Sequence, residues 1–345
     1  MAGQIGSGNP EVDGQLPKRG RPSRARVVEA LDQAIVDLKS TGGLPRPHEA
    51  EEIWQGIWLE EVHNSTAIEG NTLVLKEVRQ LLEEGRAVGN KEFSQYLEVQ
   101  GYSDAARWVY SQAVERGDWA AGALLNLTEL RNIHKLAVQP VWLSFPPASL
   151  HPQEGPGSFR KHDIEPFPGG MKPPPFPDVP ALVDDWLAQA NSSERGDSHP
   201  IYRLADLHAR FERIHPFRDG NGRTGRLALN LLLVRHGFPP AIIHKRNRPR
   251  YLAALDRADK GDIGPLAELL AREVRESIHR FLLPALAGPL RTVPLSALAS
   301  PEITKIALTS AAKRGRLQAL IQNGQWYSTR KWVDEYLAGR HQRRG

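Results

Sequence analysis

One short segment of the chain concentrates side chains that suit phosphate chemistry. It runs from His215 to Arg226 and reads HPFRDGNGRTGR. Histidine has an ordinary pKa that suits proton transfer near neutral pH, so His215 is a candidate general base. Arg223 and Arg226 are three residues apart and would share one face of a helix, where guanidinium groups can bind phosphate oxygens. Asp219 lies in the same segment, and Mg²⁺ is commonly held by one or two carboxylates together with phosphate oxygens.

The glycines of this segment predict a backbone anion site. Gly220 and Gly222 allow a tight turn whose successive N–H groups point in one direction. A helix that starts near Gly222 would add its own N-terminal N–H groups, which commonly bind phosphate. The P-loop spacing GxxxxGK(S/T) is absent from the chain. The plainer alternative is a glycine-rich helix start with incidental charges, but it requires four functional residue types to meet by chance within twelve residues.

The same segment resembles the signature of the Fic family, HxFx(D/E)GNGRxxR, and matches it at every specified position. The resemblance implies an all-α, Fic-type helical bundle with a short β-hairpin flap. It also implies an enzyme that transfers AMP from ATP to a Tyr, Thr or Ser hydroxyl of a protein, with Mg²⁺ as cofactor. Positioning and charge stabilisation would supply most of the catalysis, as in other phosphoryl-type transfers.

The resemblance carries over residue by residue. His215 would deprotonate the target hydroxyl, Phe217 would anchor the loop in the core, and Asp219 would hold Mg²⁺. Arg223 would stabilise the transferring phosphoryl charge, and Arg226 would hold the γ-phosphate. The ATP-binding set implied by the motif is Gly220, Asn221, Gly222, Arg223, Thr224, Gly225 and Arg226.

Two other stretches resemble parts of the same family. The stretch from Gly157 to Arg160, with the proline-rich segment after it, resembles the flap at about 157–172, whose edge would hold the target peptide by main-chain pairing. Ser158 to Ile164 is the expected hairpin. The stretch 247–252 resembles the region around the adenine, with Tyr251 and Leu252 as candidates. For these two residues an ordinary place in the core is the alternative.

A third resemblance lies upstream, where residues 65–71 read STAIEGN and are similar to the inhibitory motif (S/T)xxxE(G/N). Its position indicates the subclass with an N-terminal inhibitory helix, at about 60–70. Glu69, with Ser65 in the same motif, would pair with Arg226 and take away the arginine that orients the γ-phosphate. The alternatives are a plain surface glutamate, or a glutamate that positions water to remove AMP from a modified target.

Hydrophobic spacing predicts the elements that must position these residues. Val27, Leu31, Ile35 and Leu38 recur at three and four residues, which is typical of a helix. Further helices are expected at about 49–68, 74–84, 93–115, 124–138, 178–190, 199–214, 222–236, 248–259 and 263–283. The stretch 144–180 is too rich in proline to be helical. The expected domains are a helical region at 26–115 and a catalytic core at 116–285.

The two ends of the chain differ from this core. Residues 1–25 are expected to be a disordered arm, and the run from Pro17 to Pro22 resembles an AT-hook, with a solvated basic tail as the alternative. Residues 291–345 carry ten Lys and Arg against three Asp and Glu. They resemble a winged-helix or helix-turn-helix module, with helices near 295–299, 302–313 and 328–338 and a strand at 316–321. DNA is one expected partner, and protein docking or dimer formation is the alternative.

Composition narrows the classes of function. The 345 residues contain no cysteine, which excludes disulfides, cysteine zinc sites and cysteine nucleophiles in this chain. No run approaches the length of a membrane span, so a cytoplasmic protein without a membrane partner is expected. The sequence leaves three functions open: an autoinhibited AMP transferase that also modifies itself, a de-AMPylase, and a DNA-binding regulator that senses nucleotide. A homodimer is a further expectation that the resemblance brings.

Overall fold

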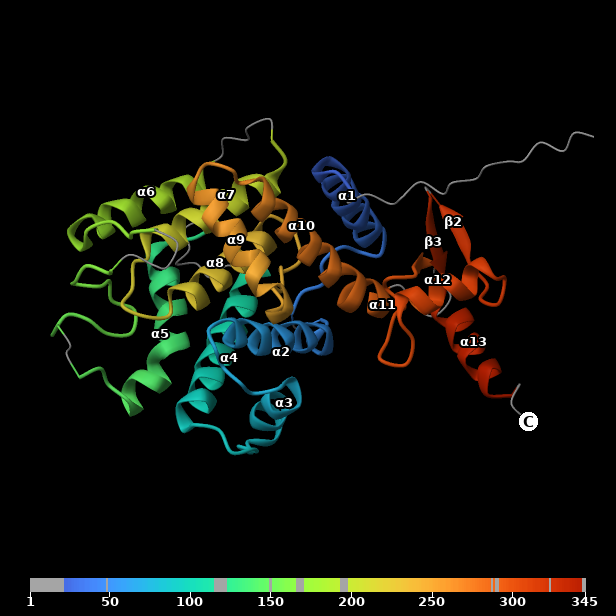
Figure 1. Cartoon of the computed structure of the whole chain (residues 1–345), viewed down its shortest axis with the longest axis horizontal. Helices are drawn as coiled ribbons and strands as arrows, with labels where there is room; N and C mark the ends of the chain where they lie inside the picture. The colour runs from blue at the N-terminus through green and yellow to red at the C-terminus, as the bar shows by residue number, and fades with distance from the viewer. Residues whose placement is uncertain are drawn as a thin grey trace, which may run out of the picture.

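Helices form most of the chain (Figure 1). The computed structural model describes residues 22–47, 49–114, 123–148, 151–165, 171–192, 198–286, 288, 292–322 and 324–342. The N-terminal half contains α1 (Arg24–Ser40), α2 (Glu51–Ile68), α3 (Leu75–Glu84), α4 (Phe93–Val114) and α5 (Leu127–Ser144). The next elements are η2 (Phe176–Asp178), α6 (Val179–Asn191), α7 (Pro200–Ile214), α8 (Asn221–Arg235), η3 (Lys245–Asn247), α9 (Arg248–Asp259) and α10 (Gly264–Ser277). A π-helical turn, η4 (Ile278–Leu282), continues α10 into α11 (Leu283–Leu286).

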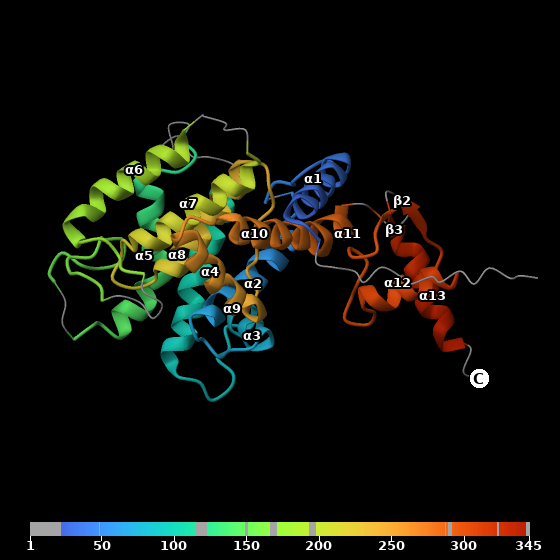
Figure 2. The same cartoon turned by 45° about the horizontal axis from the view of Figure 1, so that its top comes forward.

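Helix α8 lies at the centre of the helical bundle. Its sequence from Leu227 to Val234 is apolar on all sides except for Asn230, and all of these residues are buried, as expected of a helix without a polar face. Helices α2, α4, α5 and α7 pack against it. Figure 2 shows α8 among the other helices of the bundle. The start of α8, which carries the glycine-rich segment, lies close to the ends of α2 and α7. The fold confirms the expected mainly helical class.

The packing of α4 on α5 shows how a local residue choice sets the geometry. A Cβ atom on Gly101 of α4 would lie 2.7 Å from the carbonyl oxygen of Ala137 and 3.0 Å from Cδ of Pro140, so only glycine permits this approach. The sequence predicted that the helix would end near residue 138. Helix α5 instead continues through Pro140 to Ser144.

The structure differs from the expected flap hairpin. No strand is present in the described residues 151–165 and 171–175, and residues 166–170 of the flap lie outside the described part of the chain. The side chain of Arg160 keeps this segment in an irregular conformation. Its guanidinium donates to the carbonyl oxygens of His162 at 2.9 Å, Pro174 at 2.6 Å and His215 at 2.9 Å. Arg160 thus binds carbonyl oxygens of the flap, and the hairpin expected from Ser158 to Ile164 does not form in the described residues.

The C-terminal residues form a separate layer of structure (Figure 1). An antiparallel sheet has the order β1 (Val293–Pro294), β3 (Gln325–Ser328), β2 (Leu320–Gln322), and it is accompanied by α12 (Lys305–Lys313) and α13 (Arg330–Gln342). The helix predicted at 295–299 is wrong, because residues 295–298 form turns. Strand β2 is shorter than the expected range 316–321 and begins only at Leu320. The winged-helix assignment stays a prediction, and the basic run at 17–21 lies outside the described residues.

Two polar contacts join this module to the rest of the chain. Ser296 Oγ lies 2.8 Å from Nδ1 of His279, and the hydroxyl of Tyr327 donates to Asp37 at 3.5 Å. Within the described residues, no helix has the length and the apolar composition needed to cross a membrane.

Candidate active site

His215 occupies the first residue after α7, in an unusual backbone conformation. Its φ of 49° makes it the one non-glycine residue with a positive φ among the described residues. Histidine tolerates this left-handed region better than most residues, although at a cost in strain. The ring Nδ1 lies 3.1 Å from the carbonyl oxygen of Glu212, so Nδ1 carries the proton and Nε2 is the basic nitrogen of the neutral ring. Burial lowers the pKa of His215 below its ordinary value.

The loop after His215 is held by side chains that point into the core. Phe217 is fully buried and stacks on the ring of His134, with 3.7 Å between the centroids. The side-chain amide of Asn221 both accepts from the N–H of Phe217 and donates to its carbonyl, each at 2.8 Å. At Gly220 a Cβ atom would lie 2.5 Å from Val138, so this turn requires glycine. Phe217 therefore lies where the sequence expected its anchor.

Arg226 contacts both residues of the proposed inhibitory motif. Its Nε donates to Oγ of Ser65 at 2.7 Å, and its terminal nitrogen donates to Oε1 of Glu69 at 2.7 Å. The guanidinium is 4% exposed, while the Glu69 side chain is 38% exposed. Burial raises the pKa of the Glu69 carboxyl, but the charge of Arg226 outweighs this and holds its pKa below the ordinary value. Glu69 is therefore ionised and paired at neutral pH.

The N-terminus of α8 leaves just enough room for this carboxylate. A Cβ atom on Gly222 would lie 2.5 Å from Oε1 of Glu69 and 2.9 Å from the Arg226 guanidinium. The glycine thus opens the helix start to a negatively charged group. In this structure that group is Glu69, at the position where backbone N–H groups favour an anion.

A cavity of about 490 Å³ brings six of the predicted residues together. Its wall includes Glu69, His215, Gly222, Arg226, Tyr251 and Leu252. Tyr251 is buried and its hydroxyl lies 2.8 Å from Nε2 of His208, whereas Leu252 is partly exposed. Burial lowers the pKa of His208 to about 3, so its ring is neutral. Tyr251 is thus both a buried core residue and part of the cavity wall.

Asp219 and Arg223 lie on the other side of the loop. They line a second cavity of about 290 Å³, together with Glu98. Arg223 pairs with Glu98 and with Asp219, each at 3.1 Å. The Asp219 side chain is 72% exposed and its Oδ1 accepts from the N–H of Gly220. An exposed carboxylate beside an anion-binding turn is chemically suited to a hard cation such as Mg²⁺.

Two residues of the predicted ATP-binding set are packed inside the bundle. Thr224 is fully buried, and Gly225 lies where a Cβ atom would be 2.4 Å from Glu212 and 2.8 Å from Phe211. Neither lines the cavity that contains His215. Glycine at 225 lets α7 and α8 approach closely, which fixes the direction of Arg226 one residue later.

The structure adds residues that the sequence did not single out for this site. Glu212 lines the cavity, and burial raises the pKa of its carboxyl to about 7. Arg160 fixes the carbonyl of His215. The ring of His134 accepts from the N–H of Gly157 at 2.8 Å and donates to the carbonyl of Asp219 at 2.9 Å. His134 therefore links the flap to the loop after His215. The three residues are far apart in the sequence, so only the structure shows this link.

Comparisons with known proteins agree with this geometry. Residues 124–233 match the profile of the Fic/DOC family. The chain is 30% identical over 285 residues to the protein adenylyltransferase Fic of Aedes aegypti, covering 79% of this chain and 52% of that protein. It is 31% identical over 284 residues to the protein of the same name from Drosophila willistoni, with the same coverage of 79% and 52%. The chain thus spans about half the length of the curated relatives it matches.

Solved structures show the same fold. Fic-1 from C. elegans superposes with a TM-score of 0.61 at 26% identity, covering 74% of this chain and 72% of that one. A Fic domain containing signaling protein from Bacteroides thetaiotaomicron has a TM-score of 0.61 at 24% identity, covering 74% and 95%. The second of these likenesses concerns the fold alone.

Proposed function

The chain belongs to the Fic family through its domain at residues 124–233, and on this premise we propose that it transfers AMP from ATP to a hydroxyl side chain of a protein, including itself. The observation that carries the proposal is the single cavity whose wall holds both His215 and Arg226. A general base and a phosphate-binding cation would thereby face one bound nucleotide. The names of the curated relatives support the same reaction.

In this proposal the start of α8 binds the triphosphate. Its N–H groups and Arg226 hold the phosphate oxygens, while Tyr251 and Leu252 border the adenine. Arg223, beside Asp219, stabilises the charge that develops during transfer. Bound Mg²⁺ would supply charge neutralisation at the phosphates, and Asp219 would hold it through its exposed carboxylate.

His215 then serves as the general base. Its Nε2 removes the proton of the target hydroxyl as the hydroxyl oxygen bonds to the α-phosphorus, and pyrophosphate leaves as the bond between the α- and β-phosphates breaks. The hydrogen bond from Nδ1 to the Glu212 carbonyl fixes the tautomer that this step needs. The target would approach beside the flap, where Met171 borders the same cavity.

The proposal includes autoinhibition. In the structure Arg226 is bound by Ser65 and Glu69, so it is not available to orient a γ-phosphate. ATP would then bind in an unproductive pose. The same carboxylate shares a cavity wall with His215, which is also the arrangement needed to position a water for removal of AMP. De-AMPylation is therefore the second candidate reaction of this site.

The test is labelling of the purified full chain with ATP carrying a label on its α-phosphate and Mg²⁺. We expect weak automodification that rises in Glu69→Gly and disappears in His215→Ala, while His215→Ala still binds ATP in a calorimeter. Glu52→Gln, an exposed glutamate on the same helix, serves as the control and should label like the parent chain. Full labelling in His215→Ala would refute the assigned base. Loss of AMP from a pre-labelled target, abolished in Glu69→Gly, would indicate de-AMPylation.

A further inference from the structure

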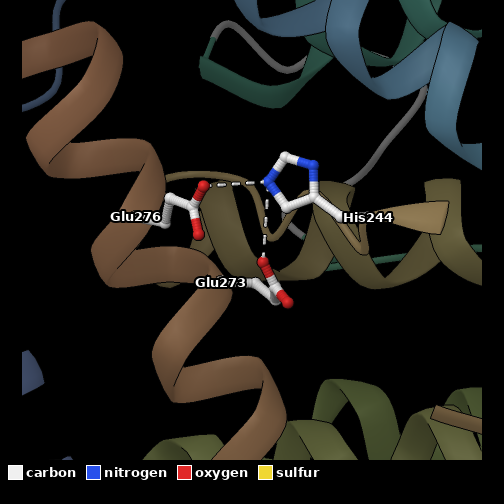
Figure 3. Close-up of side chains that lie close together, drawn as sticks. All are labelled: His244, Glu273 and Glu276. Carbon is white, nitrogen blue, oxygen red and sulfur yellow. Dashed lines mark ion pairs between the residues drawn. The ribbon is translucent and has the colours of Figure 1, made fainter. Parts of the chain in front are cut away.

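A second cluster of chemically active side chains lies outside the nucleotide cavity. His244 comes from the segment just before η3, and Glu273 and Glu276 come from one face of α10 (Figure 3). His244 Nε2 lies 3.2 Å from Oε1 of Glu276 and 3.8 Å from Oε2 of Glu273. One nitrogen and two carboxylate oxygens thus lie within 4.8 Å of one another. None of the three residues lines the cavity that contains His215.

One carboxylate oxygen of this cluster is buried without a hydrogen-bond partner in the described part of the chain. Glu273 is buried, with 3% of its surface exposed, and its Oε2 has no hydrogen-bond partner. The other oxygen, Oε1, accepts from the side-chain amide of Asn247 at 2.6 Å. That contact orients the carboxylate so that Oε2 points at His244 (Figure 3). A buried carboxylate oxygen without a partner is costly, and a bound cation would satisfy it.

The spacing of the three atoms suits a small metal ion. Bonds of about 2.0–2.2 Å from Zn²⁺ to imidazole nitrogen and carboxylate oxygen place neighbouring ligand atoms roughly 3.3–3.6 Å apart in a tetrahedron. The two distances from Nε2 of His244, 3.2 Å and 3.8 Å, lie close to this range, and all three ligand atoms lie within 4.8 Å of one another. A mixed set of one imidazole and two carboxylates favours transition metals over Ca²⁺, which prefers oxygen alone.

Two groups bear on whether a cation can bind here: the neighbouring guanidinium of Arg246 and the carboxyl of Glu273 itself. Arg246 donates to Glu276 at 3.0 Å, and its positive charge competes with a cation. Its side chain is 65% exposed, so it can turn away into solvent. Burial raises the pKa of Glu273 to about 6, yet at pH 7.5 this carboxyl is still mostly ionised and able to bind metal.

We propose that His244, Glu273 and Glu276 form a binding site for a divalent transition metal ion of the Zn²⁺ type. The ion completes its coordination with water from the cavity of about 640 Å³ that Glu273, Glu276 and Asn247 border. The wall of this cavity also carries the basic residues Arg250, Arg272, Arg275, Arg280 and Lys305. This site is separate from the Mg²⁺ position at Asp219. Its role is structural, because it ties the segment before η3 to α10.

The place of the site in the fold gives it a consequence for the inhibitory helix. The N–H of Lys245 donates to Oδ1 of Asn64 at 3.0 Å, and Nε of Arg248 donates to the carbonyl of Ile68 at 2.7 Å. Both acceptors belong to α2, and Ile68 immediately precedes Glu69. The bound metal therefore braces the segment on which the end of α2 rests.

The test uses the full chain after removal of metal with a chelator. Zn²⁺ is titrated at pH 7.5 in a calorimeter, and Co²⁺ is added separately to record its visible absorption. We expect one saturable ion per chain. Glu273→Gln and Glu276→Gln should each weaken Zn²⁺ binding by roughly tenfold or more and change the Co²⁺ spectrum. Glu273→Gln keeps the shape of the residue and an oxygen for Asn247, so its fold is expected to survive, as circular dichroism would verify.

Asp32→Asn provides the matched control. Asp32 pairs with His199 at 2.9 Å, which makes a histidine–carboxylate pair that does not belong to the three-residue cluster. Its loss should leave Zn²⁺ binding unchanged. Absence of saturable binding in the parent chain, or equal affinity in Glu273→Gln, would overturn the proposal and leave a plain ion pair. If Glu273→Gln unfolds, the Co²⁺ spectrum of the parent chain still decides, because histidine and carboxylate ligands give it a spectrum unlike that of hydrated Co²⁺.

Discussion

At the scale of single residues, Arg226 has two competing sets of partners: the γ-phosphate of the proposed reaction, and two residues of the α2 region. The same guanidinium that would hold a γ-phosphate is held by Ser65 and Glu69. The two contacts differ in strength because only Glu69 brings a charge. A hydrogen bond between neutral and charged groups contributes less than an ion pair that is also hydrogen-bonded.

This difference predicts a graded release of the inhibition. Ser65→Ala removes one contact to Arg226, and we expect automodification to rise by about fivefold, whereas Glu69→Gly should raise it by roughly ten- to a hundredfold. Labelling rates of the two variants under the same ATP concentration measure this. Ser111→Ala, at an exposed hydroxyl of α4, should change nothing. A larger effect of Ser65→Ala than of Glu69→Gly would contradict the assigned order.

The burial of His215 predicts the pH dependence of the reaction. A general base works only when unprotonated, and burial lowers the pKa of His215 below its ordinary value of 6.5. The base therefore stays active into weakly acidic solution. In the Glu69→Gly variant, kcat/KM against pH should show an acidic limb with its midpoint below 6.5. A midpoint above 7 would mean that another group controls the rate.

At the scale of elements, α2 is more than a carrier of Glu69. Its Glu61 is buried and accepts hydrogen bonds from the hydroxyls of Tyr102 and Tyr110 in α4 and from the amide of Asn230 in α8. Burial raises the pKa of Glu61 to about 7, although these hydrogen bonds and the charge of Arg226 oppose it. The proposed inhibitory helix is thus joined to the centre of the bundle by a group that titrates near neutrality.

This carboxyl makes stability depend on pH with a definite sign. Because the pKa of Glu61 is raised from 4.5 in the unfolded chain to about 7 in the folded one, its contribution is full below pH 4.5 and is lost as pH rises through 7. The difference in unfolding free energy between the parent chain and Glu61→Gln should therefore fall by about 2–3 kcal/mol from pH 5 to pH 8. Urea denaturation at several pH values measures it, with Glu52→Gln as an exposed control. A constant difference would show that Glu61 is ionised throughout.

At the scale of the whole molecule, the nucleotide cavity and the C-terminal module are separate. Among the described residues, none beyond Asp259 lines the cavity that contains His215. The net surplus of positive charge lies in residues 291–345, which hold ten Lys and Arg against three Asp and Glu. We therefore propose that DNA is contacted by this module and not by the bundle.

Removal of residues 291–345 tests this division. We expect AMP transfer to stay within about twofold of the full chain, because the catalytic groups and their supports are retained. Retention on a DNA column should fall and elute at lower salt, since fewer phosphate contacts remain. Loss of transfer in a truncated chain that still melts cooperatively would show that the module supports the bundle.

The sequence predicted contacts that are local or that a known motif describes. His215, Gly222 and Arg226 lie within twelve residues, so their meeting follows from one turn and one helix start. Glu69 is 157 residues from Arg226, and only the resemblance to a family indicated that pair. Glu212 was missed because its raised pKa comes from burial, which no local pattern shows. The flap hairpin was predicted wrongly because the tertiary contacts of Arg160 override local turn preference.

The burial of α2 also limits how its inhibition can be lifted. The helix is buried from Ile57 to Val62 and again from Asn64 to Ile68, while Glu69 follows as an exposed end. Undocking it would expose several apolar side chains at about 1.5–3 kcal/mol each, which exceeds what a single domain can spare. A rotation of the Glu69 side chain alone requires nanoseconds and not the milliseconds of a helix movement. If α2 inhibits as proposed, we expect Arg226 to be released briefly and often, and the basal AMP transfer should reflect the fraction of time that Arg226 spends without its carboxylate.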